Sequence, residues 1–176
     1  MIVLIGESGS GKTTILNELK KIGYNKMLDY TTRPKREKEE QNNEYVFVTK
    51  EEFERLWSQG KLLQRAEYNG EFYGISAENV SESSCCIQIV DSIPDMREGL
   101  KRLGKDLVKM KVFYIHVPAE ERTKRMLKRG DSIEAIQERL RMDKEKFKEV
   151  EKVADVVIEN VDLQKAVNDI LTQYTE

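Results

Sequence analysis

The chain has 176 residues, a length that indicates one domain with room for a small inserted subdomain. Its hydrophobic share of 39% and charged share of 35% are typical of a globular protein with many surface helices. The formal net charge of −2 excludes general electrostatic affinity for nucleic acids or membranes, so any cationic site must be a local cluster.

The first predicted element is a buried strand over residues 1–5, which are all apolar and are followed by a glycine. This short apolar start lacks a basic leader, so we do not interpret it as a signal peptide. A glycine-rich loop comes next, and then an amphipathic helix that ends at Gly23. Residues 25–30 are expected to form a second strand.

Residues from about 31 to 80 are predicted to form a small β-rich insertion. Residues 31–44 are polar and highly charged, which indicates a long exposed loop of the kind that is often functional. A strand is expected over 45–48 and a short helix over 50–60. Asn69-Gly70 lies between two apolar stretches and predicts a β-hairpin.

Strands and helices alternate again after residue 80. We expect strands over 85–90, 112–117 and 156–158, and helices over 94–103, 118–129, 133–152 and 163–174. This alternation predicts an α/β fold, with a parallel sheet covered by helices on both faces. Cys85 and Cys86 are the only cysteines and lie in an apolar strand, so buried thiols in a reducing, cytoplasmic compartment are expected.

The sequence from Gly6 to Thr13 matches the phosphate-binding pattern G-x-x-x-x-G-K-[ST] at every fixed position. A polyphosphate needs inward-pointing backbone N–H groups, and glycines allow the tight path and close approach that this requires. The residues expected to bind ATP here are Gly6, Ser8, Gly9, Ser10, Gly11, Lys12, Thr13 and Thr14. Lys12 would reach the β- and γ-phosphates, and the Thr13 hydroxyl would bind Mg²⁺. A glycine loop without ligand remains the alternative.

A second contact to Mg²⁺, direct or through water, is expected from an acid at the end of a core strand. Asp91 follows the apolar run 85–90 and meets this description, so we count it with the metal-binding and the acceptor-binding residues. A strand-end or N-cap aspartate is the alternative interpretation.

Several motifs within the predicted insertion occur in a fixed order. They are TTRPKR over 31–36, YVFV over 45–48, EYNG over 67–70 and YGIS over 73–76. Together with the phosphate-binding loop, they resemble the guanylate kinase family along nearly the whole chain. The resemblance implies a single domain with a P-loop NTPase core (1–30, 81–118 and 153–176), a monophosphate-binding insertion (about 31–80) and a helical lid (about 119–152).

The resemblance also implies roles for individual residues. Arg33 and Arg36 match the arginines that hold the acceptor phosphate, Tyr45 and Tyr73 match tyrosines that bind the same phosphate, and Ser76 matches a serine at the base edge. Two guanidinium groups suit a dianionic phosphate because each can donate two parallel hydrogen bonds. A solvated, charged loop remains the alternative for the two arginines.

Lys12 and four further residues match the donor site and the lid. Lys12, Arg125, Arg129 and Arg139 match residues that stabilise the transferred phosphoryl group, and Asn160 matches a residue near the adenine of ATP. The resemblance implies direct in-line transfer without a covalent enzyme intermediate. A helix laced with salt bridges is the alternative for each lid arginine, because glutamates are interspersed among them.

Three positions depart from the family. Gln64 replaces a glutamate that accepts two hydrogen bonds from guanine, Asp29 replaces a serine, and Ile89 replaces the first of two strand-end aspartates. These changes could recode the base, with Asp29 accepting from adenine N6 and the Gln64 amide donating to N1. A shifted pose or a bridging water could instead keep guanine acceptable.

The function expected from these observations is ATP-dependent phosphorylation of GMP or dGMP, with ATP and Mg²⁺ as donor and cofactor. The alternatives are a nucleoside monophosphate kinase for AMP or dAMP, and a noncatalytic nucleotide-binding module of the same fold. Retention of Lys12, Thr13, Arg33 and Arg36 favours an enzyme. Small-molecule nucleotides are the expected partners, without nucleic acid or membrane, and monomer and dimer both stay open.

Overall fold

The computed structural model describes residues 1–35, 45–68 and 70–175, and its core is a five-stranded parallel sheet. The strands are ordered β2-β7-β1-β8-β9 and comprise Asn25–Lys26, Ser84–Ile87, Ile2–Ile5, Lys111–His116 and Val156–Glu159. Every residue of β1 is buried, because helices cover both faces of the sheet. The predicted α/β fold with a parallel core sheet is therefore confirmed.

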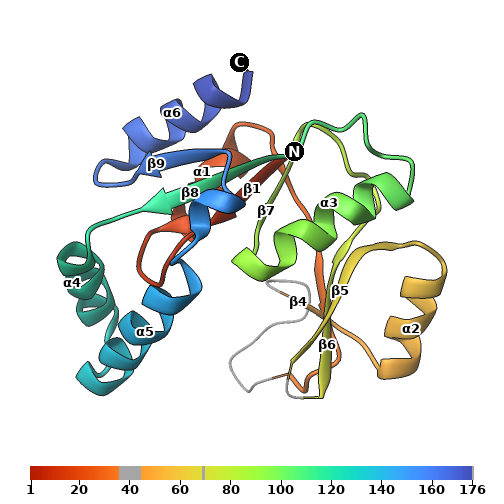
Figure 1. The fold of residues 1–176 in the computed structure, drawn as a ribbon, viewed down its shortest axis with the longest axis horizontal. Helices are drawn as coiled ribbons and strands as arrows, with labels where there is room; N and C mark the ends of the chain where they lie inside the picture. The colour runs from red at the N-terminus through yellow and green to blue at the C-terminus, as the bar shows by residue number, and fades with distance from the viewer. Residues whose placement is uncertain (36–44, 69, 176) are drawn as a thin grey trace.

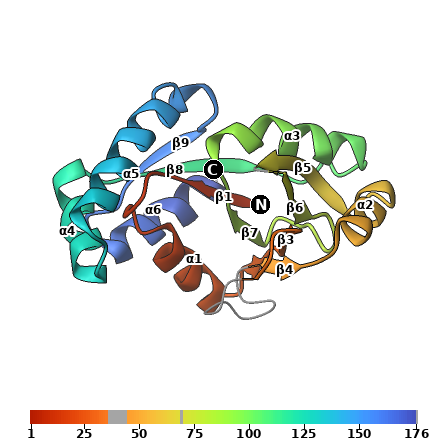
Figure 2. The same cartoon turned by 90° about the horizontal axis from the view of Figure 1, so that it is seen from below.

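Two hydrophobic clusters fill the space between this sheet and its helices. Helices α1 (Lys12–Lys21) and α6 (Leu163–Thr175) cover one face, where Ile15, Leu19 and Ile170 are fully buried. Helix α3 (Ile93–Arg102) covers the other face through residues such as Met96 and Leu100. Figure 2 shows α1 and α6 on one side of the sheet and α3 on the other.

The predicted insertion contains a second, four-stranded sheet ordered β4-β3-β6-β5. Its strands comprise Tyr45–Phe47, Asp29–Thr31, Glu71–Ser76 and Leu62–Tyr68, and helix α2 comprises Lys50–Ser58. Helix α2 packs against one face of this sheet, where Phe53, Leu56 and Leu62 form a small core. The predicted hairpin around residues 69 and 70 is confirmed by the antiparallel pairing of β5 with β6.

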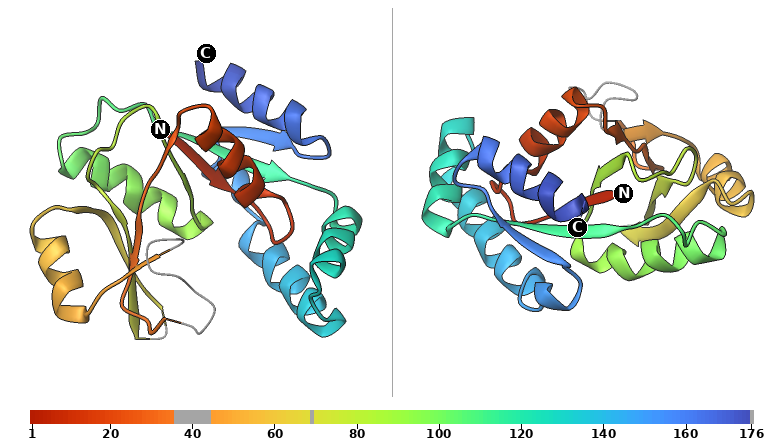
Figure 3. Two further views of the ribbon diagram at one scale, coloured as in Figure 1. Left: turned by 180° about the vertical axis from the view of Figure 1, so that it is seen from behind. Right: turned by 90° about the horizontal axis from the view of Figure 1, so that it is seen from above.

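Helices α4 (Ala119–Arg129) and α5 (Ile133–Lys146) follow β8 and form a helical hairpin. Gly130 ends α4 with a φ of 94°, and the Ser132 hydroxyl caps α5 by accepting a hydrogen bond from the Ala135 N–H. Figures 1 and 3 show the hairpin beyond the carboxyl end of β8, on the other side of the core from the four-stranded sheet. No helix within the described ranges is both long and apolar enough to cross a membrane.

The prediction of one strand over residues 25–30 is wrong, because the chain passes from one sheet to the other within this segment. Strand β2 ends at Lys26 in the core sheet, and β3 begins at Asp29 in the second sheet. Between them, Met27 is buried in the core, and the Leu28 carbonyl accepts a hydrogen bond from the Ser76 N–H. The second sheet therefore begins two residues before the predicted insertion.

Two other predicted elements are too long. The strand expected over 85–90 ends at Ile87 and is followed by a 3₁₀ turn, Val90–Ser92, so Asp91 does not directly follow the strand. The helix expected over 133–152 ends at Lys146, and a second 3₁₀ turn comprises Val150–Lys152. In the latter segment Phe147 and Val150 pack into the core next to α3, which a straight continuation of the exposed helix would not allow.

Candidate active site

The loop between β1 and α1 has a path that only glycine fits at two positions. Gly9 and Gly11 have φ values of 80° and 90°, in the left-handed region that disfavours other residues. A Cβ atom on Gly11 would lie 2.4 Å from Asn160 Nδ2, and one on Gly9 would lie 3.0 Å from the Arg122 carbonyl oxygen. The glycines that the sequence singled out therefore let neighbouring chain segments close around the loop.

Lys12 extends its side chain back along this loop. Its Nζ donates hydrogen bonds to the carbonyl oxygens of Gly6 and Glu7, at 2.7 and 3.0 Å. Burial lowers the pKa of Lys12 from 10.5 to about 8, although the carboxylates of Asp143 and Glu7 oppose this shift. An anion inside the loop would restore the favourable environment of the ammonium group.

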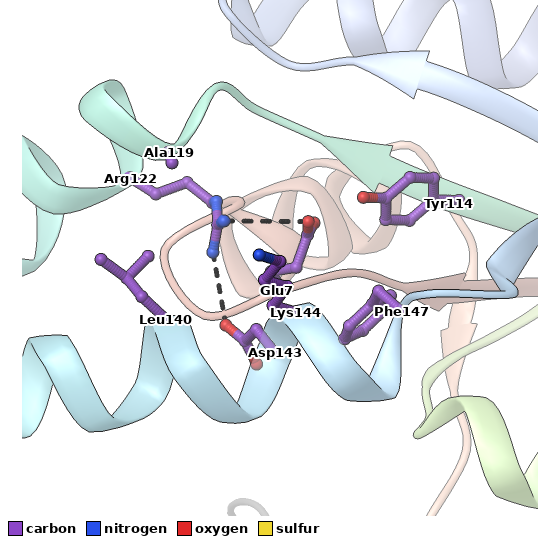
Figure 4. A pocket seen from close by; sticks show the side chains of 8 residues that line it. All are labelled: Glu7, Tyr114, Ala119, Arg122, Leu140, Asp143, Lys144 and Phe147. Carbon is purple, nitrogen blue, oxygen red and sulfur yellow. Dashed lines mark hydrogen bonds and ion pairs between the residues drawn. The ribbon is translucent and has the colours of Figure 1, made fainter.

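A buried ion cluster connects the loop to both helices of the hairpin (Figure 4). Arg122 on α4 lies 3.3 Å from Asp143 on α5 and 3.8 Å from Glu7 in the loop, measured between nitrogen and carboxylate oxygen. All three side chains are about nine-tenths buried. Arg122 also donates to the Val117 carbonyl, and the Ser8 N–H donates to Asp143 at 2.8 Å.

This cluster borders a cavity of about 360 Å³ between the loop, β8 and the hairpin. The hydroxyl of Tyr114 faces the same cavity (Figure 4), and burial together with the Glu7 carboxylate raises its pKa. Sequence reasoning missed Glu7, Arg122 and Asp143. The one available signal was a charged residue, Glu7, at a variable position of the phosphate-binding pattern.

Two of the expected donor-site residues lie beside the loop. Asn160 follows β9, and its Nδ2 donates to the Ser10 carbonyl at 2.7 Å. Arg125 on α4 donates to the Asn160 carbonyl at 2.9 Å and to Glu121 at 3.2 Å. Hydrogen bonds of Asn160 and Arg125 thus connect the loop, the end of β9 and α4. These two residues were singled out from the sequence independently of each other.

The other two lid arginines are farther out on the hairpin. Arg129 pairs with Asp131 at the turn between α4 and α5, and its side chain is 56% exposed. Arg139 is exposed on α5.

The second sheet places four of the expected acceptor-binding residues on one face, namely Asp29, Tyr45, Gln64 and Tyr73. Residues opposite each other on neighbouring strands share a face, and the pairs include Asp29 with Tyr45, Asp29 with Ile75, Gln64 with Ile75, and Thr31 with Tyr73. This face is opposite the one that packs on α2. The rings of Tyr45 and Tyr73 meet edge to face, with 6.3 Å between the ring centres.

Arg33 follows β3 and lies over the aromatic side chains of this sheet. Its guanidinium carbon is 5.2 Å from the centre of the Tyr45 ring and 5.1 Å from that of Phe47. Arg33, Tyr45 and Tyr73 therefore form one cationic and aromatic group on this sheet. Arg36, the second expected phosphate ligand, falls outside the described residues.

Gln64 and Asp29 are connected through a residue that sequence reasoning missed. Gln88, directly after β7, accepts a hydrogen bond from Gln64 Nε2 at 3.1 Å and donates to Asp29 Oδ1 at 3.0 Å. The Ser92 hydroxyl also lies 3.1 Å from Gln88 Oε1. Ser76, expected at the base edge, is buried and accepts from the Glu78 N–H at 3.0 Å.

The expected metal-binding residues are at the surface. Thr13 is exposed in the first turn of α1, and Asp91 is exposed in the 3₁₀ turn after β7. Thr14, expected to bind ATP, is exposed beside Thr13. In the described ranges no three His, Cys, Asp or Glu side chains are grouped as a metal site. Mg²⁺ in kinase sites takes one or two protein ligands and completes its shell with phosphates and water, so such a group is not required.

Comparison with known proteins gives one consistent result. Residues 1–175 match the family described as guanylate kinase. The guanylate kinase of Neisseria gonorrhoeae is 34% identical over 175 residues, covering 97% of this chain and 84% of that protein. The guanylate kinase of Anaplasma phagocytophilum is 30% identical over 175 residues, covering 97% and 83%. The crystal structure of guanylate kinase from Anaplasma phagocytophilum has a similar fold, with a TM-score of 0.67 at 24% identity over 99% of this chain and 84% of that one.

Proposed function

Because the chain belongs to the guanylate kinase family, whose members are phosphotransferases, we propose that it transfers the γ-phosphoryl group of ATP to GMP or dGMP. One observation carries this proposal. A glycine loop with a partly buried lysine and an arginine–tyrosine group on a separate sheet occur in one chain, which suits a donor and an acceptor phosphate. Binding modules that only hold a nucleotide do not need both.

The donor site would be formed by the loop from Gly6 to Thr14. The left-handed glycines let Asn160 and α4 pack closely around the loop, and the N-terminus of α1 adds a positive dipole end. Lys12 would exchange its carbonyl partners for the β- and γ-phosphate oxygens. Asn160, held against the Ser10 carbonyl, would lie at the nucleoside end of this site.

Mg²⁺ would be held by the Thr13 hydroxyl at the start of α1, with Asp91 as a second contact through water. Both side chains are exposed, so the oxygen atoms that such an ion needs are available to it. When bound, the ion would neutralise charge on the β- and γ-phosphates.

The acceptor site would use the face of the second sheet that lies opposite α2. Arg33 would bind the monophosphate through a bidentate guanidinium contact, with Arg36 as its partner. Tyr45 and Tyr73 are in contact with each other and would donate their hydroxyl groups without adding charge. Gln64 and Asp29 would then lie at the base end of the acceptor.

Catalysis would consist of positioning and electrostatic stabilisation, because direct phosphoryl transfer needs little covalent chemistry from the protein. Lys12 and Arg125 are already at the loop. Arg129 and Arg139 would reach the transferred group when the hairpin closes, which would also exclude water and suppress idle hydrolysis of ATP.

The proposal takes small-molecule nucleotides in the cytoplasm as the partners of the protein. It predicts a defined stoichiometry for the reaction. Incubation with ATP, Mg²⁺ and GMP should yield one ADP and one GDP per turnover. Phosphorus NMR measures the product through the signal of the new β-phosphate of GDP. Lys12→Met should abolish this signal. Release of inorganic phosphate without GDP would contradict the proposal and would favour a regulatory ATPase.

A further inference from the structure

A chain of side-chain hydrogen bonds connects the two sheets at the base end of the acceptor face. Gln64 on β5 donates to Gln88, and Gln88 donates to Asp29 on β3, with distances of 3.1 and 3.0 Å. Gln88 directly follows β7 of the core sheet, whereas Gln64 and Asp29 belong to the second sheet. The chain therefore fixes side chains whose backbones belong to different parts of the fold.

Elementary hydrogen-bond chemistry sets the direction of this chain. An ionised carboxylate only accepts, so Gln88 must turn its NH₂ group toward Asp29. The carbonyl oxygen of Gln88 then faces Gln64, and it is also within reach of the Ser92 hydroxyl. Gln64 must in turn present its NH₂ group to Gln88. The orientation of the Gln64 amide thus follows from the position of one carboxylate.

The far end of the chain is an acceptor without a donor. Gln64 is 5% exposed, and its Oε1 has no hydrogen-bond partner among the residues that the structure describes. A buried acceptor left unpaired is costly, so this oxygen favours a ligand that supplies an N–H group. An adenine N1 placed here would set one acceptor against another, whereas guanine N1–H or N2–H would satisfy the oxygen.

We propose that Gln88 is a positioning residue that fixes the Gln64 amide, so that Gln64 Oε1 reads the N–H edge of the acceptor base. This inference rests on the proposed monophosphate kinase function. In this arrangement the single carbonyl oxygen of the Gln64 amide replaces the two carboxylate oxygens of a glutamate. The carboxylate of Asp29 acts through Gln88 by setting the direction of the relay.

Two substitutions can move the carboxylate from position 29 to position 88 of this series of hydrogen-bonded side chains. In Gln88→Leu, the Gln64 amide is free to turn over, and the ratio of kcat/KM for GMP to that for AMP should fall at least about tenfold. The double variant Asp29→Asn with Gln88→Glu keeps the net charge and places an acceptor-only group next to Gln64. That variant should hold Gln64 in its original orientation and keep the ratio within about threefold of the wild type.

Asp29→Asn alone should lie between these two, since an asparagine can face Gln88 with either end. Gln59→Leu, at an exposed position after α2, is the matched control and should leave the ratio unchanged. Gln88→Met serves as a second removal variant of similar length if Gln88→Leu is poorly folded by circular dichroism. The KM for ATP should stay the same throughout, because these hydrogen bonds belong to the acceptor side of the protein.

An unchanged ratio in Gln88→Leu and Gln88→Met would overturn the inference, and so would a double variant no better than Asp29→Asn. Equal loss of kcat/KM for both monophosphates would assign Gln88 a purely structural role, which also contradicts it. Failure of the wild-type protein to phosphorylate any monophosphate is a different result, and it would reject the proposed function itself.

Discussion

The backbone N–H of Ser8 donates a 2.8 Å hydrogen bond to Asp143 Oδ2, across 135 positions of sequence. Arg122 holds the same carboxylate and is within 3.4 Å of the Ser8 carbonyl oxygen. The loop residue Ser8 is therefore held on both its N–H and its carbonyl side by groups of the α4–α5 hairpin. The loop and the base of the hairpin form one packed unit, so closure of the hairpin must involve its outer part or must break this cluster.

The first prediction concerns the stability of this cluster. Arg122→Met should lower the free energy of unfolding by about 3–5 kcal/mol, because it leaves Glu7 and Asp143 as buried carboxylates without their ion-pair partner. Urea denaturation measures the effect. Arg141→Met, which removes an arginine 71% exposed and paired with Glu138, is the control and should change stability by less than about 0.5 kcal/mol. Equal effects of the two substitutions would show that the cluster is not buried as described.

The second prediction follows from the lowered pKa of Lys12. Bound polyphosphate should return the pKa of Lys12 toward 10.5 from its value of about 8 in the free protein. Binding of ATP above pH 8 should therefore take up a proton, and affinity should fall by up to about tenfold per pH unit from pH 8 toward 10.5. Calorimetry in buffers of different ionisation enthalpy measures the proton uptake.

Lys12→Met removes the titrating group and should bind ATP weakly with no such pH slope. The same shift affects folding with a defined sign. The folded pKa lies below the unfolded one, so the penalty for the buried charge is present in full below pH 8 and is relieved as pH rises toward 10.5. A pH slope of ATP affinity that persists in Lys12→Met would contradict this assignment.

The third prediction separates the acceptor site from the donor site. Arg33→Ala should raise the KM for the monophosphate about tenfold to a hundredfold, because a charge-assisted contact to its phosphate is lost, and should leave the KM for ATP unchanged. Arg33→Lys should recover little of this loss, since an ammonium group cannot make the bidentate contact. Steady-state kinetics with each substrate varied in turn measures both constants. The control is Lys61→Ala, which removes an exposed partner of Glu78.

The fourth prediction concerns Gly99, where α3 crosses β5 without room for a side chain. A Cβ atom here would lie 1.8 Å from the Leu63 carbonyl oxygen. Gly99→Ala should lower the free energy of unfolding by about 1–3 kcal/mol and displace β5 next to Gln64. Thermal unfolding measures the loss, and a raised KM for the monophosphate should accompany it. Glu98→Ala, at an exposed position of the same helix, should have little effect on either quantity.

Much of the fold could be predicted from sequence because its signals are local. The apolar run of β1, the glycine pattern before α1 and the Asn-Gly turn between β5 and β6 each act over a few residues. Segment 25–30 failed for the opposite reason. Its residues suit a strand at both ends, and only the tertiary packing of Met27 shows that the two ends belong to different sheets.

The candidate site shows the same limit. The motifs marked Arg125, Asn160, Arg33 and Tyr45, whose roles stay predictions. In the structure Arg125 and Asn160 lie beside the phosphate-binding loop, and Arg33 lies over the Tyr45 ring. Glu7, Arg122, Asp143 and Gln88 were missed, because each acts only through partners far away in sequence. A lone arginine on a charged helix does not differ from its solvated neighbours until the fold buries it.

The measurement that tests the central claim most directly is a coupled ATP-consumption assay with Mg²⁺ and each of GMP, dGMP, AMP, dAMP, IMP, UMP and CMP in turn, with Lys12→Ala as the inactive control. We predict turnover with GMP or dGMP that far exceeds turnover with AMP and requires Lys12. Faster turnover with AMP, or silence with every monophosphate despite binding of ATP, would contradict the account.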